Sequence, residues 1–194
     1  MKKTIALVLC AVLVLSAFSA CGGQHSAGHF ELQSEAVIDV DTNASEQLAE
    51  AYKGIKERPR FIVGADVISV TAGDTFTVYY SLQDAKKVAS FDLTVEYDTE
   101  NLEIVKTTPA KIESLYFEEN NIDGGLLFFA YTARTIDIDD AVLLEVTFRV
   151  KKDVAVKEVF ANLKVDTMEI GVDRDGTTVV QIPDVNVDFA LPVR

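Results

Sequence analysis

The sequence predicts an all-β protein, a nine-stranded antiparallel jelly-roll sandwich. From residue 61 onward, apolar and polar residues alternate with a period of two, the pattern of strands that bury one face. These runs are short, and turn-forming residues separate them. Almost no stretch of this region carries apolar residues at helical spacing. Two antiparallel sheets packed face to face are therefore the expected architecture.

Three runs alternate most clearly, at residues 75–82, 91–98 and 142–151, and Phe91 and Phe148 are expected in the core. Shorter apolar stretches predict the remaining strands near residues 61–70, 101–106, 114–118, 125–131, 159–165 and 178–189. Turn-forming residues lie between the strands, at 72–74, 98–101, 120–125, 137–140 and 173–176. A domain over residues 61–194 is long enough to bury a core without staples.

The first 21 residues have the layout of a bacterial lipoprotein signal. Lys2 and Lys3 precede an apolar run from Ile5 to Leu15, and small residues lead into Cys21. Residues 1–20 are therefore expected to be a signal peptide, and Cys21 the acylated first residue of the mature protein. This predicts an extracytoplasmic protein, lipid-anchored to the bacterial cell envelope. An ordinary signal peptide cleaved nearby is the alternative.

Cysteine use and charge exclude several classes of function. Cys10 leaves with the signal and Cys21 carries the lipid, so the mature domain has no disulfide, thiol nucleophile or cysteine-ligated metal. The formal net charge is -13, and such a surface repels nucleic acid and favours basic or neutral partners. We expect no nucleic-acid partner and a monomer.

Residues 21–60 are mostly polar and are expected to form a tether. Within it, residues 43–46 have the composition of a helix cap, and Leu48, Tyr52 and Ile55 would follow on one side of a short helix that ends before Pro59. Two alternatives stay open, a helix packed on the domain and a loosely helical spacer.

The order of the predicted strands resembles that of cohesin domains. Residues 88–98 followed by 102–104 are similar to the third and fourth strands of that family, and the resemblance continues at 71–75, 125–131 and 142–151. It covers roughly residues 61–190. It implies a jelly roll, an architecture shared with carbohydrate-binding modules, that binds dockerins through one flat sheet face. Dockerins are small calcium-dependent modules carried on enzymes and other secreted proteins. The implied function is display of a dockerin-bearing protein at the cell surface.

The resemblance also implies the residues of a partner-binding face. Ser90 and Asp92 fall at positions of dockerin-facing polar residues, and Thr94 is the next outward residue. Residues 126–132 are apolar on both sides, and the bulkier set of Leu127, Phe129 and Tyr131 is expected to fill the interior. The outward set, together with a third candidate from the preceding strand, then comprises Leu126, Phe128, Ala130, Thr132 and Tyr116. The alternative is that the tether helix covers this outer side.

Catalytic chemistry is not expected. His25 and His29 both lie in the predicted tether, which leaves the domain without an imidazole base. No cofactor and no metal are expected, because residues 173–177 lack the ligand ladder of an EF-hand and the acidic residues at 137–140 are better explained as a solvated loop. Two alternative functions remain, a structural envelope domain and a carbohydrate-binding module that uses Tyr79, Tyr116 and Phe128.

Overall fold

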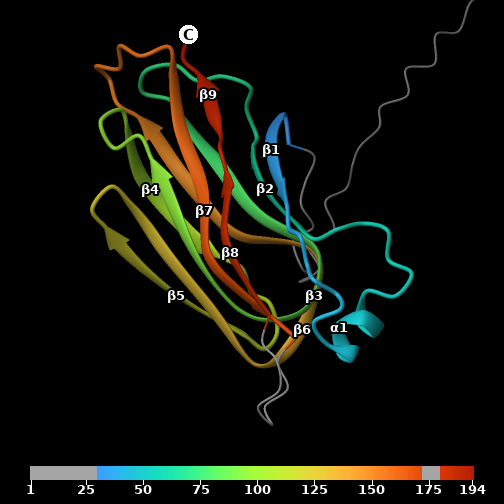
Figure 1. Cartoon of the computed structure of the whole chain (residues 1–194). Coiled ribbons are helices and arrows are strands. Elements are labelled where there is room, and N and C mark those ends of the chain that lie inside the picture. Colours follow the sequence, from blue (N-terminus) through green and yellow to red (C-terminus); the bar gives the residue numbers. More distant parts are fainter. Residues whose placement is uncertain (1–29, 172–179) are drawn as a thin grey trace, which may run out of the picture.

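The computed structural model describes residues 30–171 and 180–194, and these are mostly β-strand (Figure 1). The elements in chain order are β1 (Leu32–Val37), α1 (Glu46–Ala51), β2 (Arg60–Ala65), β3 (Thr75–Tyr97), β4 (Leu102–Pro109), β5 (Leu115–Ile122), β6 (Gly125–Val150), β7 (Glu158–Ile170), β8 (Val180–Val187) and β9 (Ala190–Pro192). The nine strands pair antiparallel throughout, which confirms the predicted fold class.

Two unusually long strands, β3 and β6, build the sandwich. Residues 75–83 of β3 pair with residues 140–149 of β6, and residues 78–83 also pair with β2, whereas residues 88–97 pair with β7 and with the first part of β6. β1, β2, β4 and the parts of β3 and β6 that pair in the first of these regions form one layer, which we call the β2 layer. The parts that pair in the second region, completed by β5 and β8, form the β5 layer. Each long strand therefore runs through both layers.

The inner faces of the two layers meet in the core. The Tyr80 hydroxyl of the β2 layer donates to the Ala161 carbonyl on β7 at 3.3 Å. The Tyr97 ring of the β5 layer lies 5.3 Å from Phe148 of the β2 layer. Phe148 and Phe91 are both fully buried, as the alternation predicts.

The two long strands bend together, β6 close to the turn predicted at 137–140 and β3 at residues 81–90, where no turn is predicted. In β3 the pairing with β6 slips between Tyr80 and Ser81 and again between Ala85 and Ser90, and Asp84 and Lys87 have positive φ values of 55° and 59°. Such bulges bend a strand and let it pass from one sheet to the other.

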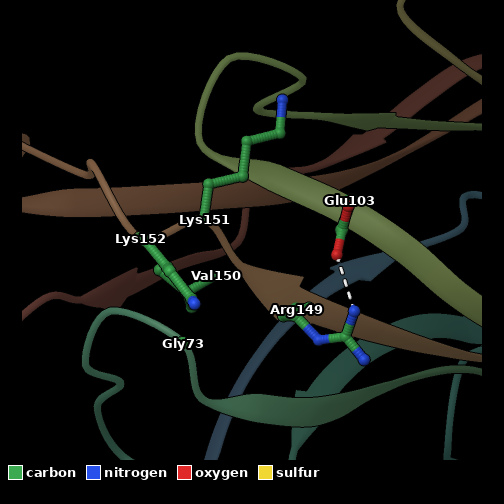
Figure 2. A pocket seen from close by; sticks show the side chains of 6 residues that line it. All are labelled: Gly73, Glu103, Arg149, Val150, Lys151 and Lys152. Carbon is green, nitrogen blue, oxygen red and sulfur yellow. Dashed lines mark hydrogen bonds and ion pairs between the residues drawn. The ribbon is translucent and has the colours of Figure 1, made fainter.

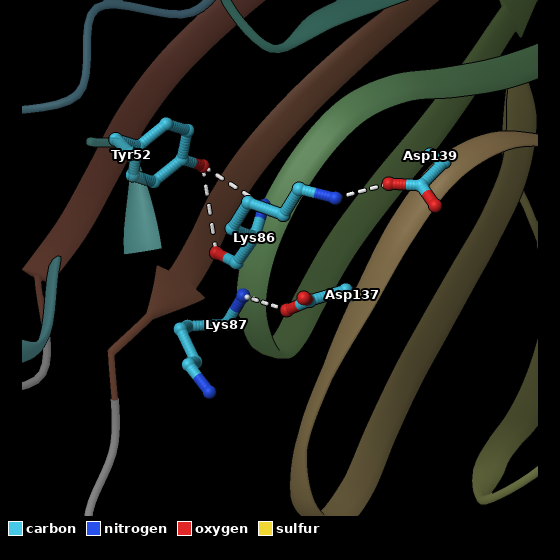
Figure 3. A network of polar contacts seen from close by, with 5 residues as sticks. All are labelled: Tyr52, Lys86, Lys87, Asp137 and Asp139. Carbon is cyan, nitrogen blue, oxygen red and sulfur yellow. Dashed lines mark hydrogen bonds and ion pairs between the residues drawn. The ribbon is translucent and has the colours of Figure 1, made fainter. Parts of the chain in front are cut away.

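The prediction of a solvated loop at 137–140 is wrong, because these residues belong to β6 and hold the bend (Figure 3). The Lys87 backbone N–H donates to Asp137 Oδ1 at 3.0 Å, and Lys86 Nζ pairs with Asp139. The described residues contain no group of three or more His, Cys, Asp or Glu side chains that could hold a metal. The calcium-loop candidate at 173–177 falls largely on residues 172–179, which lie outside the described part.

Part of the expected tether belongs to the fold. β1 pairs with β2, and Ile38 and Leu48 are fully buried in the core. Ser45 caps α1 by accepting a hydrogen bond from the Leu48 N–H at 3.1 Å, and Leu48 packs on Gly171. Of the two alternatives, the helix therefore packs on the domain. The predicted boundary between tether and domain at residue 60 is too late, since the ordered fold already includes β1.

We expect Leu48→Ala to lower the free energy of unfolding by about 2–5 kcal/mol, because it opens a cavity under α1. Chemical denaturation measures this directly. Ile55→Ala is the matched control: Ile55 is 36% exposed, and its truncation should change stability by less than about 0.5 kcal/mol. Equal stabilities for the two variants would show that the helix is not part of the core.

Candidate functional site

The outer face of the β5 layer brings most of the predicted site residues together. Residues directly opposite in antiparallel strands point to the same side of the sheet. The register therefore gives three outward rows across β5, β6, β3 and β7, which are Tyr116–Tyr131–Ser90–Glu169, Glu118–Phe129–Asp92–Thr167 and Asn120–Leu127–Thr94–Lys164.

An aromatic strip crosses one side of this face. Tyr116 is 58% exposed and Tyr131 is 40% exposed. Their ring centroids lie 5.6 Å apart with the planes 25° from parallel, and Phe129 stacks on Tyr131 at 5.5 Å. The three rings thus stand side by side on the sheet, and Tyr116 and Tyr131 are the exposed ones. We call Tyr116, Tyr131 and Phe129 the aromatic strip.

The predicted orientation of residues 126–132 is wrong. Phe128 and Ala130 are fully buried, because they lie opposite Leu93 and Phe91 of the core face. Phe117 stacks on Phe128 from the inner side at 5.0 Å. Thr132 lies opposite the buried Leu115, so it also belongs to the core side of the strand.

The outward residues of this strand are Leu127, Phe129 and Tyr131, the set that was expected inside. Because both sets are apolar, side-chain bulk could not decide between the two faces. The alternative in which the tether helix covers the outer side is also wrong, since Tyr131 is exposed and α1 packs against the bend of β3.

Ser90, Asp92 and Thr94 follow one another along β3 beside the aromatic strip, and we call these three residues the polar row. The Ser90 hydroxyl donates to Glu169 Oε2 at 2.9 Å, and the Thr94 hydroxyl donates to Asp166 Oδ2 at 2.8 Å. Both hydroxyls are thus turned toward β7. Ser90 and Asp92 are half-buried, while Thr94 is 9% exposed. All three point outward as the resemblance implies, and their role in binding a partner stays a prediction.

Asp92 is the least well satisfied group on this face. Its Oδ1 is buried and accepts no hydrogen bond, and its Oδ2 receives only a long one, 3.4 Å from the Thr167 hydroxyl. Burial, with a smaller contribution from the neighbouring Asp166 and Glu169 carboxylates, raises the pKa of Asp92 above its usual value. The folded domain therefore holds a carboxylate in a position that disfavours its charge.

A shallow pocket of about 450 Å³ lies at the end of the sandwich, between β4, the end of β6 and the turn before β3 (Figure 2). Its lining residues are Gly73, Glu103, Arg149, Val150, Lys151 and Lys152. Glu103 is engaged by Arg149 at 2.8 Å, and both side chains are about half exposed. Because no second carboxylate and no hydroxyl nucleophile faces Glu103 there, this lining does not support hydrolytic chemistry.

Tyr79, Tyr116 and Phe128 do not together form a sugar-binding platform. A sugar stacks on an open ring face. Phe128 is buried, the Tyr79 ring stacks on Phe30 at 5.4 Å, and Tyr116 has one face against Tyr131. The three residues named for the carbohydrate alternative thus lie in different places, and only one of them presents a partly open ring.

Fold and site together define a two-layer β-sandwich whose β5 layer exposes Tyr116 and Tyr131 on its outer face. The chain belongs to the cohesin family: the family model described as the cohesin domain matches residues 63–184. None of the curated proteins matches the sequence.

Three solved structures show the same fold. The first is a cohesin module from a family 33 glycoside hydrolase of Clostridium perfringens, with 16% identity and a TM-score of 0.51, and the match covers 68% of this chain and 93% of that one. The second is the sixth cohesin of scaffoldin B from Acetivibrio cellulolyticus in complex with a Cel5 dockerin mutant, with 19% identity, a TM-score of 0.51 and coverages of 68% and 97%. The third is the seventh ScaB type I cohesin from Pseudobacteroides cellulosolvens, with 16% identity, a TM-score of 0.50 and coverages of 68% and 90%.

Replacing Asp92 by Asn should stabilise the domain at neutral pH. Folding raises the pKa of Asp92, so the folded state binds this proton more tightly than the unfolded state does. The contribution of Asp92 to stability therefore falls as the pH rises from its pKa in the unfolded chain to its higher pKa in the folded protein. An amide costs less to bury than a carboxylate. We expect Asp92→Asn to melt at a higher temperature than the natural protein at pH 7, and the two to converge near pH 3.

Thermal melts across this pH range measure the difference, and Glu118→Gln is the control. Glu118 is an exposed carboxylate in the same row as Asp92, so its neutralisation should leave the melting temperature nearly unchanged. A lower melting temperature for Asp92→Asn at pH 7 would contradict the assignment of Asp92 as a destabilised carboxylate.

Proposed function

We propose that this chain is a cohesin module that binds a dockerin-bearing protein through the outer face of the β5 layer and displays it at the surface of a bacterial cell. The observation that carries the proposal is the aromatic strip, with Tyr116 and Tyr131 exposed, beside Asp92 on this outer face. Membership of the cohesin family and the dockerin bound to the Acetivibrio cellulolyticus relative support it. In this function the module binds and performs no catalysis.

Exposed tyrosines on a sheet face are suited to a protein interface. Such interfaces draw most of their affinity from a few central aromatic residues, and their polar neighbours fix the register. The hydroxyl group of a tyrosine also lets the ring be exposed in the free protein without a large solvation penalty. Tyr131 and Tyr116 are therefore the expected anchors, and Asp92 the expected acceptor for a donor on the partner.

The charge of the face indicates a partner with a basic contact surface. Asp92, Glu118 and Glu169 face outward, and none of them has an ion-pair partner among the described residues. The one lysine in the three rows, Lys164, pairs with Asp166 at 2.6 Å. A lysine or arginine on the partner would neutralise this excess and speed the encounter.

Tyr131→Ala and Asp92→Ala should each weaken dockerin binding by an order of magnitude or more, while the melting temperature changes little or rises. The measurement is calorimetric titration with purified dockerin modules, in calcium, taken from the host organism and including the Cel5 dockerin as a reference probe. Val105→Ala is the control, since Val105 is 45% exposed on β4, away from this face. The proposal fails if none of the dockerin modules binds the natural protein.

The anchoring part of the proposal rests on the first 21 residues, which lie outside the described part of the structure. In the described residues, no helix is long and apolar enough to cross a membrane. A lipid on Cys21 would instead hold the domain at the membrane surface, and stable anchoring needs more than one acyl chain. Cys21 thus gives the module its place at the cell envelope.

Mass spectrometry of the protein from its host should find acyl chains on Cys21 and no residues before it. The Cys21→Ala variant should be released from the membrane fraction or remain unprocessed, because it cannot accept the lipid. An unmodified mature N-terminus would contradict the anchoring proposal and leave the proposal on dockerin binding untouched.

A further inference from the structure

We infer that an anchor at Cys21 orients the domain, with the outer face of the β2 layer toward the bilayer and the outer face of the β5 layer toward the medium. This rests on the proposed lipid anchor. The inference concerns which surface of the sandwich lies against lipid. It is carried by the place where the chain leaves the fold, by the length of chain before that point and by the charges on the two outer faces.

The chain leaves the fold across the outer face of the β2 layer. Phe30 stacks on Tyr79 with the ring centroids 5.4 Å apart, and Tyr79 lies opposite Gly64 in the outward row of this layer. Gly64 leaves the space in which the Phe30 ring lies, since a Cβ at that position would stand 2.4 Å from the ring. The next residue, Glu31, donates its N–H to the Ala65 carbonyl at 3.0 Å. The exit point is therefore fixed on this face.

The length of the preceding chain limits the other orientation. From Cys21 to Phe30 the chain advances nine residues, which reach at most about 32 Å. The sandwich is roughly 20 Å thick, because its layers pack about 10 Å apart and carry side chains on both outer faces. With the β5 layer toward the lipid, the chain must first span this thickness. Only about 12 Å of reach would then remain between the domain and the lipid.

The charges on the two outer faces favour the same orientation. On the outer side of the β2 layer, Arg60 pairs with Glu35 at 3.8 Å and with Asp84 at 3.6 Å, and Arg149 pairs with Glu103 at 2.8 Å. Glu145, opposite Tyr79, is the carboxylate of this layer's outward rows that has no ion-pair partner among the described residues. The outer face of the β5 layer carries the carboxylates of Asp92, Glu118 and Glu169 without ion-pair partners among the described residues. An anionic lipid surface repels the second face more strongly than the first.

The orientation can be measured on a chain of residues 21–194, in which Cys21 is the single cysteine. The Cys21 thiol is coupled to a maleimide lipid in nanodiscs that also contain anionic lipid and a gadolinium-chelating lipid. Paramagnetic relaxation is then read at threonine methyl groups. Thr77 and Thr147, whose hydroxyls lie 3.2 Å apart, report on the β2 layer, and Thr94 and Thr167 report on the β5 layer.

We expect relaxation at Thr77 and Thr147 to exceed that at Thr94 and Thr167 severalfold, because the effect falls steeply with distance. Phe30→Ala should reduce the difference, since it frees the exit point. Moving the anchor to a cysteine appended after Arg194, in a Cys21→Ser background, should remove the difference, because the Arg194 N–H is bonded to Val70 at the end of the sandwich.

Equal or reversed relaxation in the Cys21-coupled chain would overturn the inference. Since the lipid is attached chemically, this result does not depend on whether the host acylates Cys21 or on whether a dockerin binds. Failure of the orientation and failure of the proposed function are therefore separate outcomes.

Discussion

The architecture depends on the bend that β3 and β6 make together between the two layers. Extended strands this long would form one flat ribbon with no enclosed core. The bulges near Ser81 and Val88 fold the ribbon over, and the backbone groups freed there find partners: the Tyr52 hydroxyl bridges the Lys86 N–H and carbonyl at 2.9 and 3.4 Å, and Asp137 accepts from the Lys87 N–H (Figure 3). Backbone groups left without hydrogen-bond partners are costly, so Tyr52 at the end of α1 and the acidic residues of β6 stabilise the bend that joins the two layers. Because of this bend, Tyr79 lies on the outer face of the β2 layer and Asp92 on the outer face of the β5 layer.

Sequence reasoning was reliable where one face of a strand is polar. Alternation around Phe76, Phe91 and Phe148 assigned their burial correctly, since each apolar position has polar neighbours. It failed at residues 126–132, because both faces of this strand are apolar and only the pairing of Phe128 with Leu93 decides which one is inside. The bend was also missed as such, since its acidic residues have the composition of a turn. β1 gave too weak a signal because its six residues, LQSEAV, contain little apolar surface.

The candidate site combines features that oppose stability with features that suit recognition. Asp92 is a partly buried carboxylate with one unpartnered oxygen, beside two further carboxylates, and nothing in the core requires it. Natural proteins retain such destabilised groups mainly where a function uses them. The cohesin resemblance placed the polar row on an outward face, and the alternation of Leu115, Tyr116 and Phe117 placed Tyr116 there too. Phe129 and Tyr131 could not be located from sequence, because their exposure follows from strand register and not from composition.

The shared strands also determine how the protein responds to a partner. Because β3 and β6 belong to both layers, the layers cannot slide past each other without breaking the ladder that joins them. The aromatic strip therefore keeps its spacing, and its rings restrict one another's rotamers by stacking. Little conformational entropy is left to lose at this surface when a complex forms. The ordering that association requires falls on the partner, so that differences in affinity among partners would reflect mainly how well each one is preorganised.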